Sequence, residues 1–181
     1  MSSKQLPIIA TERVILRPMN QADFRSMREL DTDPDVVRFL GNGRIRTESE
    51  TSENLAKIMG DYERFGLGLY AATDCTSGRF LGRAGLIPWQ LEEGLSWEIG
   101  YSFKKSEWNR GLATEVARTL KEWGFLNLRP SHLISLIHPG NEISIRVAKK
   151  VGMSFWKVIR LGDLELSAYK IEANASLQAQ R

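Results

Sequence analysis

The turn from Trp108 to Glu115 has the composition of a backbone phosphate-binding site. Residues 95–103, which precede it, place large apolar side chains at every second position, a pattern typical of a β-strand. Apolar residues after the turn recur at one-turn spacing and predict an amphipathic helix beginning near Gly111. The first amides of a helix lack partners within it, and the helix dipole makes that end positive. The amides of residues 110–114 could therefore hold a phosphate or pyrophosphate, which Gly111 would allow to come close.

Glycine between a strand and a helix is also common where nothing is bound, so this turn alone leaves a purely structural role open. A second segment repeats the arrangement further along the chain. Residues 131–137 are predicted to form a strand, Asn141 to begin a short helix that runs to Lys150, and Gly152 to stop that helix. The two segments together indicate more than one structural turn.

These two segments resemble the GNAT acetyltransferase superfamily. In that family the signature Gln/Arg-x-x-Gly-x-Gly/Ala opens the helix that holds the pyrophosphate of acetyl-CoA, and the matching positions here are Trp108, Gly111 and Ala113. Tryptophan at the first position, together with the run from Asn141 to Met153, is similar to the branch that acetylates the N-termini of ribosomal proteins. The resemblance covers about residues 8–172.

The resemblance implies an α/β (α+β) fold with a mixed, mostly antiparallel sheet of about seven strands and about four flanking helices. It also implies that the strands at 95–103 and 131–137 splay apart at their ends. The length of 181 residues fits a single acetyltransferase domain, 1–181, with its core at about 8–172 and a frayed tail at 173–181.

The local patterns predict the remaining elements. Gly66 to Ala71 superficially matches a dinucleotide fingerprint, but it follows a helix and opens a strand, the reverse of what that motif requires. Helices are predicted behind Asn20, over 36–40 and behind a capping box at Thr47. The predicted strands are 13–17, 67–73, 79–87 and a closing hairpin of 153–160 and 164–171.

The resemblance assigns the cofactor contacts to the turn, to the end of the strand before it and to the start of the second helix. Asn141 would hydrogen-bond the pantetheine amides. Its alternative role is to cap the helix, and both roles can hold at once. The expected acetyl-CoA-binding residues are Ile99, Tyr101, Ser102, Phe103, Trp108, Asn109, Arg110, Gly111, Leu112, Ala113, Thr114, Asn141 and Ser144.

Acetyl transfer to an amine requires a neutral amine aimed at the thioester and help for the developing charges. Ser144 matches the serine that the ribosomal branch uses to protonate the leaving thiolate, with Tyr169 and Tyr101 in reserve; a solvent-facing hydroxyl is the alternative. Glu98 lies on the strand beside the expected carbonyl site and is the candidate general base. An ordinary ion pair is the alternative for Glu98.

Composition narrows the class of protein. The chain is 42% hydrophobic and 26% charged, with a net charge of +3, which is too weak for a dedicated nucleic-acid binder. It contains neither an apolar run long enough to cross a bilayer nor a signal peptide, so a cytoplasmic protein without a membrane partner is expected. Cys75 has neither a disulfide partner nor an activating histidine. His132 and His138 lack partners at ligand spacing, so no metal is expected.

The expected function is acetyl-CoA-dependent N-acetyl transfer to a primary amine, by direct attack, in a monomer or homodimer. The resemblance favours a protein N-terminal α-amine as acceptor, and small amines such as polyamines, antibiotics or amino-acid-like amines are the alternative. The loop of residues 41–46, expected at the acceptor mouth, carries Arg44 and Arg46, which would suit an acceptor with a carboxylate or phosphate. A non-catalytic acyl-CoA-binding module is a rival from another class.

Overall fold

The computed structural model describes residues 6–173, so the expected tail from residue 174 onward lies outside the described residues. One eight-stranded sheet has the order β1-β2-β3-β4-β5-β6-β8-β7, in which only the β5–β6 pairing is parallel. The strands are β1 Ile9–Ala10, β2 Val14–Arg17, β3 Leu69–Asp74, β4 Phe80–Leu91, β5 Gly94–Phe103, β6 His132–Ile137, β7 Ser154–Leu161 and β8 Leu164–Glu172. The helices are α1 Phe24–Asp31, α2 Pro34–Val37, α3 Glu48–Phe65, α4 Leu112–Asn127 and α5 Glu142–Lys150, with 3₁₀ turns at Gln21–Asp23 and Lys105–Glu107.

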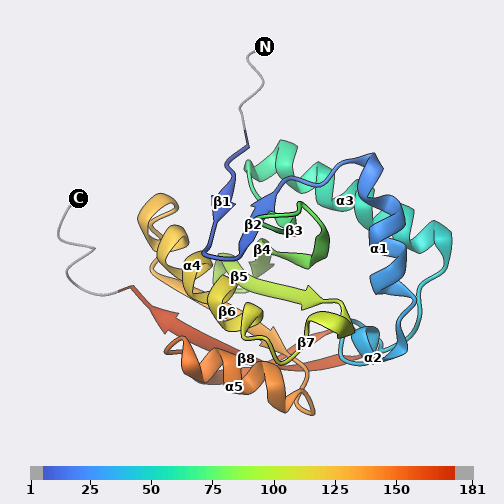
Figure 1. The fold of residues 1–181 in the computed structure, drawn as a ribbon. Helices are drawn as coiled ribbons and strands as arrows, with labels where there is room; N and C mark the ends of the chain where they lie inside the picture. The colour runs from blue at the N-terminus through green and yellow to red at the C-terminus, as the bar shows by residue number, and fades with distance from the viewer. Residues whose placement is uncertain (1–5, 174–181) are drawn as a thin grey trace.

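The sheet separates two helical layers, with α1 and α3 on one face and α4 and α5 on the other (Figure 1). Strand β4 shows how alternation produces this division. Leu86 packs closely against Gly124 of α4: a Cβ added to Gly124 would lie 3.1 Å from Leu86 Cδ1. Arg83 is three positions earlier, so it points to the opposite face, where it pairs with Asp31 of α1.

The ends of α3 follow the predicted local chemistry. The Glu50 amide donates to the Thr47 hydroxyl at 3.2 Å, and the Thr47 amide donates to the Glu50 carboxylate at 2.7 Å. These two bonds form the predicted capping box, which satisfies two amides that the helix itself cannot. Gly66 ends the helix in the left-handed conformation, with φ of 72°.

Two details of the fold differ from the predictions. The sheet has one strand more than the seven predicted. This additional strand, β1, is only two residues long, too short for an alternating pattern to be visible in the sequence. Helix α2 spans Pro34–Val37, so the prediction of 36–40 was wrong at both ends. The Asp33 side chain accepts bonds from the Asp35 and Val36 amides, and Pro34 fits the first helical position, so the helix starts earlier.

The predicted splaying of β5 from β6 is confirmed. These strands share a single register pair, Glu98 with Ile134, whereas β4 pairs with β5 along the whole of β5. Side chains occupy the gap where the ladder fails. The Ser135 hydroxyl donates to the Ile99 carbonyl at 2.9 Å, and the Leu136 amide donates to the Glu98 carboxylate at 3.2 Å. Where these strands part, two of their backbone groups are thus bonded to the side chains of Ser135 and Glu98 instead of to the neighbouring strand.

Candidate active site

The turn before α4 presents backbone amides without a side-chain cap. Gly111 is the N-cap residue, with φ of 78° and ψ of 0°, and no side chain caps this end of the helix. The first helical bond runs from the Glu115 amide to the Gly111 carbonyl at 3.1 Å, so the amides of residues 112–114 precede the helical ladder. Arg13 steadies the turn by donating to the Arg110 carbonyl at 2.9 Å. This geometry fits an anion at the helix N-terminus.

A cavity of about 460 Å³ lies in front of this turn, between the end of β5 and the starts of α4 and α5. Its wall also carries the cations Arg38, Arg146 and Lys150, for which the sequence predicted no cofactor contact. The expected cofactor-binding residues that line it are Tyr101, Ser102, Phe103, Trp108, Asn109, Gly111, Leu112, Ala113, Thr114 and Asn141. Most of the predicted cofactor residues are thus brought together around one cavity.

Three expected cofactor residues lie outside that wall. Ile99 lines the neighbouring cavity instead. The Arg110 guanidinium pairs with the buried Glu107, which also binds Arg79 at 2.7 Å, so this side chain serves the turn itself. Ser144 lines neither cavity. The Arg110 and Ser144 side chains are therefore not part of the wall of the first cavity.

Trp108, which replaces the usual first residue of the signature, connects the turn to the strand. Its indole Nε1 donates to the Phe103 carbonyl at 2.9 Å, while about a third of the residue stays exposed. The bond holds the strand end against the turn. The indole N–H of Trp108 therefore links the turn to the end of the strand.

A second cavity, of about 380 Å³, adjoins the first. Both cavities are lined by Phe39, Leu40, Tyr101, Ser102 and Asn141. Glu98 lines only the second cavity, together with residues of α3 and of the β7–β8 hairpin. Two chambers therefore meet at the end of β5, one beside the uncapped amides and one beside a carboxylate.

Glu98 is buried, with 9% of the residue exposed. Trp89 Nε1 donates to one carboxylate oxygen at 2.5 Å and the Leu136 amide to the other at 3.2 Å. Burial raises the pKa of Glu98 to about 7, and these two bonds oppose the rise only in part. No cation within residues 6–173 pairs with it, so the ion-pair alternative was wrong. A carboxyl group with a pKa near neutrality suits proton transfer.

The three candidate acids occupy different places. Asn141 accepts from the Ser144 amide at 3.1 Å, which confirms its capping role at α5. Burial raises the pKa of Tyr101 to about 12, and the neighbouring Ser144 opposes that rise. Tyr101 lines both cavities, whereas Tyr169 lines neither and packs against Phe155, with ring centroids 6.0 Å apart. Tyr101 therefore lies at the junction of the two cavities, with Ser144 beside it.

Cys75 lies apart from this chemistry, whereas His138 lines the second cavity. Cys75 is exposed in the turn after β3, with its thiol 3.4 Å from the Glu12 carbonyl. The His138 ring lies 5.3 Å from that of Phe39, and its Nδ1 accepts from the Gly140 amide. Residues 6–173 contain no cluster of three potential metal-ligating His, Cys, Asp or Glu side chains and no helix long and apolar enough to cross a membrane.

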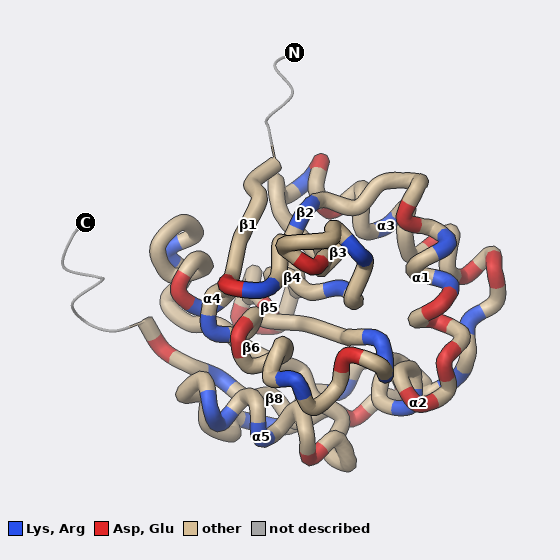
Figure 2. The backbone as a smooth tube through the Cα atoms, in the orientation of Figure 1, with Lys and Arg blue, Asp and Glu red and all other residues tan. Residues whose placement is uncertain are grey.

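Charge is distributed around the molecule. Figure 2 shows Lys and Arg interspersed with Asp and Glu along most elements of the described chain. This distribution agrees with the small net charge of +3. The charged groups that matter for binding are therefore those that line the two cavities, since no single face carries charge of one sign in this view.

The sheet splayed at β5, the uncapped amides of α4 and the adjoining carboxylate define an acetyltransferase of the GNAT type. Residues 13–154 match the family described as Acetyltransferase (GNAT) domain, and the chain belongs to that family. The chain is 34% identical over 163 residues to the uncharacterized protein YkkB of Bacillus subtilis, covering 90% of this chain and 94% of that protein.

Solved structures share the fold. An acetyltransferase from Agrobacterium tumefaciens superposes with a TM-score of 0.81 at 26% identity, covering 94% of this chain and 97% of that one. The ribosomal L7/L12 α-N-protein acetyltransferase RimL, solved with coenzyme A, gives a TM-score of 0.74 at 12% identity, covering 92% of this chain and 98% of that one. Acetyl transfer is thus the activity of this chain's family, while the acceptor needs a separate argument.

Proposed function

We propose that this protein transfers an acetyl group from acetyl-CoA to a primary amine, with the cofactor in the first cavity and the amine in the second. One observation carries the proposal: the two cavities meet at Tyr101 and Ser102, and Glu98 lines only the second. The uncapped amides of residues 112–114 would hold the pyrophosphate. Acetyl-CoA supplies the activated acyl group, and the protein supplies orientation and proton transfer.

The proposed chemistry assigns one proton to each side of the junction. The amine nitrogen forms a bond to the acetyl carbon, and the bond from that carbon to sulfur breaks. Glu98 takes the proton that the amine loses, directly or through a water molecule, and Tyr101 with Ser144 donates a hydrogen bond or proton to the departing thiolate. A pKa of about 7 lets Glu98 accept a proton at neutral pH, whereas a carboxylate with its usual pKa would be a weaker base.

Two acceptor classes remain for the proposal. The first is a protein N-terminal α-amine, supported by the Trp108 and Asn141–Met153 patterns and by the fold shared with RimL. The second is a small-molecule amine. The second cavity supports this candidate, because its volume of about 380 Å³ is within the range that takes a small ligand.

A thiol-release assay tests both the reaction and the acceptor class. The purified protein with acetyl-CoA is offered small amines and short peptides with free N-termini, and the products are identified by mass. Release of coenzyme A with an acetylated amine supports the proposal. Binding of acetyl-CoA with no turnover of any amine or peptide would instead support the rival, a binding module.

A further inference from the structure

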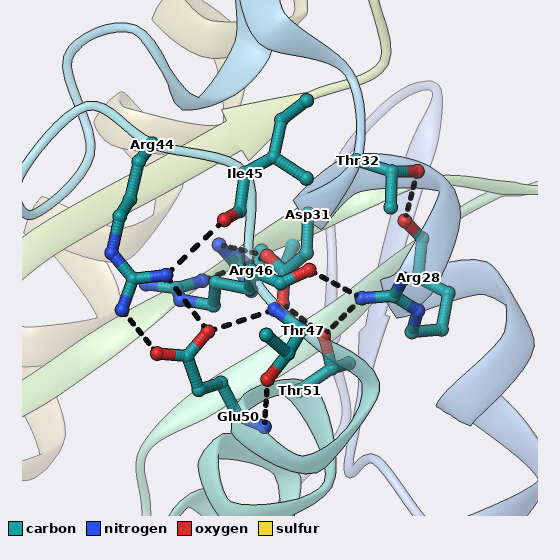
Figure 3. Close-up of polar contacts among 10 residues, drawn as sticks. Arg28, Asp31, Thr32, Arg44, Ile45, Arg46, Thr47, Glu50 and Thr51 are labelled. Atoms are coloured by element: carbon teal, nitrogen blue, oxygen red, sulfur yellow. Dashed lines mark hydrogen bonds and ion pairs between the residues drawn. The ribbon is translucent and has the colours of Figure 1, made fainter.

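Figure 3 shows a buried cluster of charged and polar side chains around Asp31, and Arg46 of this cluster lines the second cavity. Asp31 is fully buried. One carboxylate oxygen accepts from Arg46 at 2.7 Å and lies 3.1 Å from Arg83 Nη2. The other accepts from the Thr51 hydroxyl at 3.1 Å. Arg28 completes the cluster by donating to the Arg46 carbonyl at 2.8 Å and to Thr51 at 3.1 Å.

The cluster has more positive than negative charge. Arg46 and Arg83 share the single carboxylate of Asp31, and no second carboxylate pairs with either among the described residues. Burial and the nearby Arg46 lower the pKa of Arg83. A buried cation is costly unless it is paired, so this arrangement calls for an additional anion.

Arg83 also has an unused hydrogen-bond donor. Its residue exposure is only 5%, and its Nη1 has no partner within the described part of the chain. Buried polar atoms are nearly always hydrogen-bonded, and the N–H groups of a guanidinium can act only as donors, so each needs an acceptor. Arg83 lines the second cavity, and so does Arg46. An oxyanion in that cavity would supply the missing acceptor and balance the charge.

The arginines and Glu98 line the same cavity at different positions along the β4–β5 ladder. Glu98 is the register partner of Ile87, and Ser102 is the partner of Arg83, so Glu98 and Arg83 lie four residues apart along the ladder. That spacing corresponds to about 13 Å along the strand, and the distance between the charged groups is shorter where their long side chains reach toward each other. Between them lies the register pair Gly85 and Gly100, and the Ile87 side chain covers Gly100, since a Cβ added there would lie 2.5 Å from Ile87 Cδ1.

The other charged groups on the wall do not cancel this polarity. Lys57 and Asp61 of α3 pair with each other at 3.1 Å. His138 is engaged locally, since its Nδ1 accepts from the Gly140 amide. Arg44, which the sequence placed beside Arg46, pairs with Glu50 and lines neither cavity. The second cavity therefore has a carboxyl group in one part of its wall and an unbalanced arginine pair in another.

We infer that the acceptor is a small amine that carries an oxyanion, a carboxylate or a phosphate, bound by Arg46 and Arg83 while its amine faces Glu98. This inference rests on the proposed function, because it takes the second cavity as the acceptor site. The planar guanidinium groups match either oxyanion. An amine and anion separated by roughly 6–10 Å would span the distance between Glu98 and the arginines, given the strand spacing.

The direct test is a length series of ω-amino acids, from glycine to 8-aminooctanoate, each compared with its uncharged amide in the thiol-release assay. A parallel series of aminoalkyl phosphates tests whether the site prefers a phosphate to a carboxylate. We expect kcat/KM to be about tenfold to a hundredfold higher for the anionic member of the best pair, in line with a charged hydrogen bond, and to peak at an intermediate length. Equal rates for acids, phosphates and amides, or a preference only for peptides, would overturn the inference.

The matched variants are Arg46→Met and Arg44→Met, which each remove one cation from the same loop. Arg46→Met should raise KM for the anionic acceptor at least about tenfold and abolish the preference over the amide, while kcat changes little. Arg46→Lys should restore part of the preference because it keeps the charge. Arg44→Met should behave as wild type. Loss of the preference in both methionine variants alike, or in neither, would contradict the assigned site.

A binding measurement separates this inference from the proposed function. Succinate and inorganic phosphate are titrated against wild type and Arg46→Met, and the melting temperature is followed. A rise in wild type that Arg46→Met lacks would support the oxyanion site even if no amine were turned over. Arg83→Met removes the second cation but leaves Asp31 paired with Arg46, and the folded variant should also lose the shift. No shift with either anion, together with no acid preference, would overturn the site.

Discussion

Glu98 is the residue whose environment most constrains the chemistry. Its carboxyl group is buried against Trp89 and the freed Leu136 amide, which gives it a pKa of about 7. A base with this pKa is half ionised near neutral pH. The rate of acetyl transfer should therefore rise with pH through about 7 in the wild-type protein, as measured by kcat/KM for a fixed acceptor.

Glu98→Gln should lower kcat/KM about a hundredfold at pH 7, because a removed general base typically costs that much. The deficit should shrink as pH rises, since the acceptor amine then arrives already neutral. Glu93→Gln, which changes an exposed carboxylate paired with Lys157, is the control and should match wild type. A Glu98→Gln protein with the wild-type pH profile would return Glu98 to a structural role.

The same pKa predicts a stability effect. The native carboxyl pKa of about 7 lies above the ordinary value of 4.5, so between these values the native state binds the proton that the unfolded chain has lost. The free energy of unfolding should therefore fall as pH rises from 5 to 8, by on the order of 3 kcal/mol from this group. Denaturant titrations of wild type and Glu98→Gln should diverge over that range. Parallel curves would contradict the raised pKa.

Tyr101 and Ser144 should act together, because Ser144 lies close enough to oppose the rise in the pKa of Tyr101. Tyr101→Phe and Ser144→Ala should each lower kcat while acetyl-CoA affinity changes little, since the proton is needed mainly in the transition state. The double variant should lose less than the product of the two single losses. Tyr169→Phe, which alters a residue outside both cavities, is the control. Full turnover in both single variants would assign the proton to water.

At the scale of elements, the N-terminus of α4 depends on Gly111 in the left-handed conformation. Gly111→Asp would add a negative charge where the pyrophosphate is proposed to bind and should weaken acetyl-CoA binding at least about tenfold, measured by calorimetry. The substitution is also strained, so Gly66→Asp is the matched control, with φ of 72° at the end of α3 and no place in either cavity. Equal acetyl-CoA affinity in the two folded variants would place the phosphate site elsewhere.

The whole molecule should be stabilised by acetyl-CoA, because the first cavity is assembled from β5, α4, α5 and the region of α2. At a hundredfold excess over its dissociation constant, a ligand that binds only the native state adds about 2.7 kcal/mol. For a domain of this size that corresponds to a rise in melting temperature of roughly 5–10 °C. NAD is the control ligand. A shift with NAD and none with acetyl-CoA would contradict the cofactor assignment.

Local chemistry was sufficient for the elements that carry the cofactor cavity. The period of apolar residues, the Thr47 capping box and the glycines after α3 and before α4 act within a few residues of themselves, so their outcome is visible in the sequence. Ten of the expected cofactor residues line one cavity for the same reason: they are neighbours in the chain or belong to two motifs of known spacing.

The acceptor side was decided by tertiary structure. Asp31 and Arg83 are 52 positions apart, and Glu98 meets the Leu136 amide only because β5 and β6 part beyond one register pair. Arg44 and Arg46 look alike in the sequence, yet one pairs with Glu50 and the other with Asp31. A buried charge takes its pKa and its role from groups that distant segments bring to it, and such packing leaves no periodic or local signal in the chain.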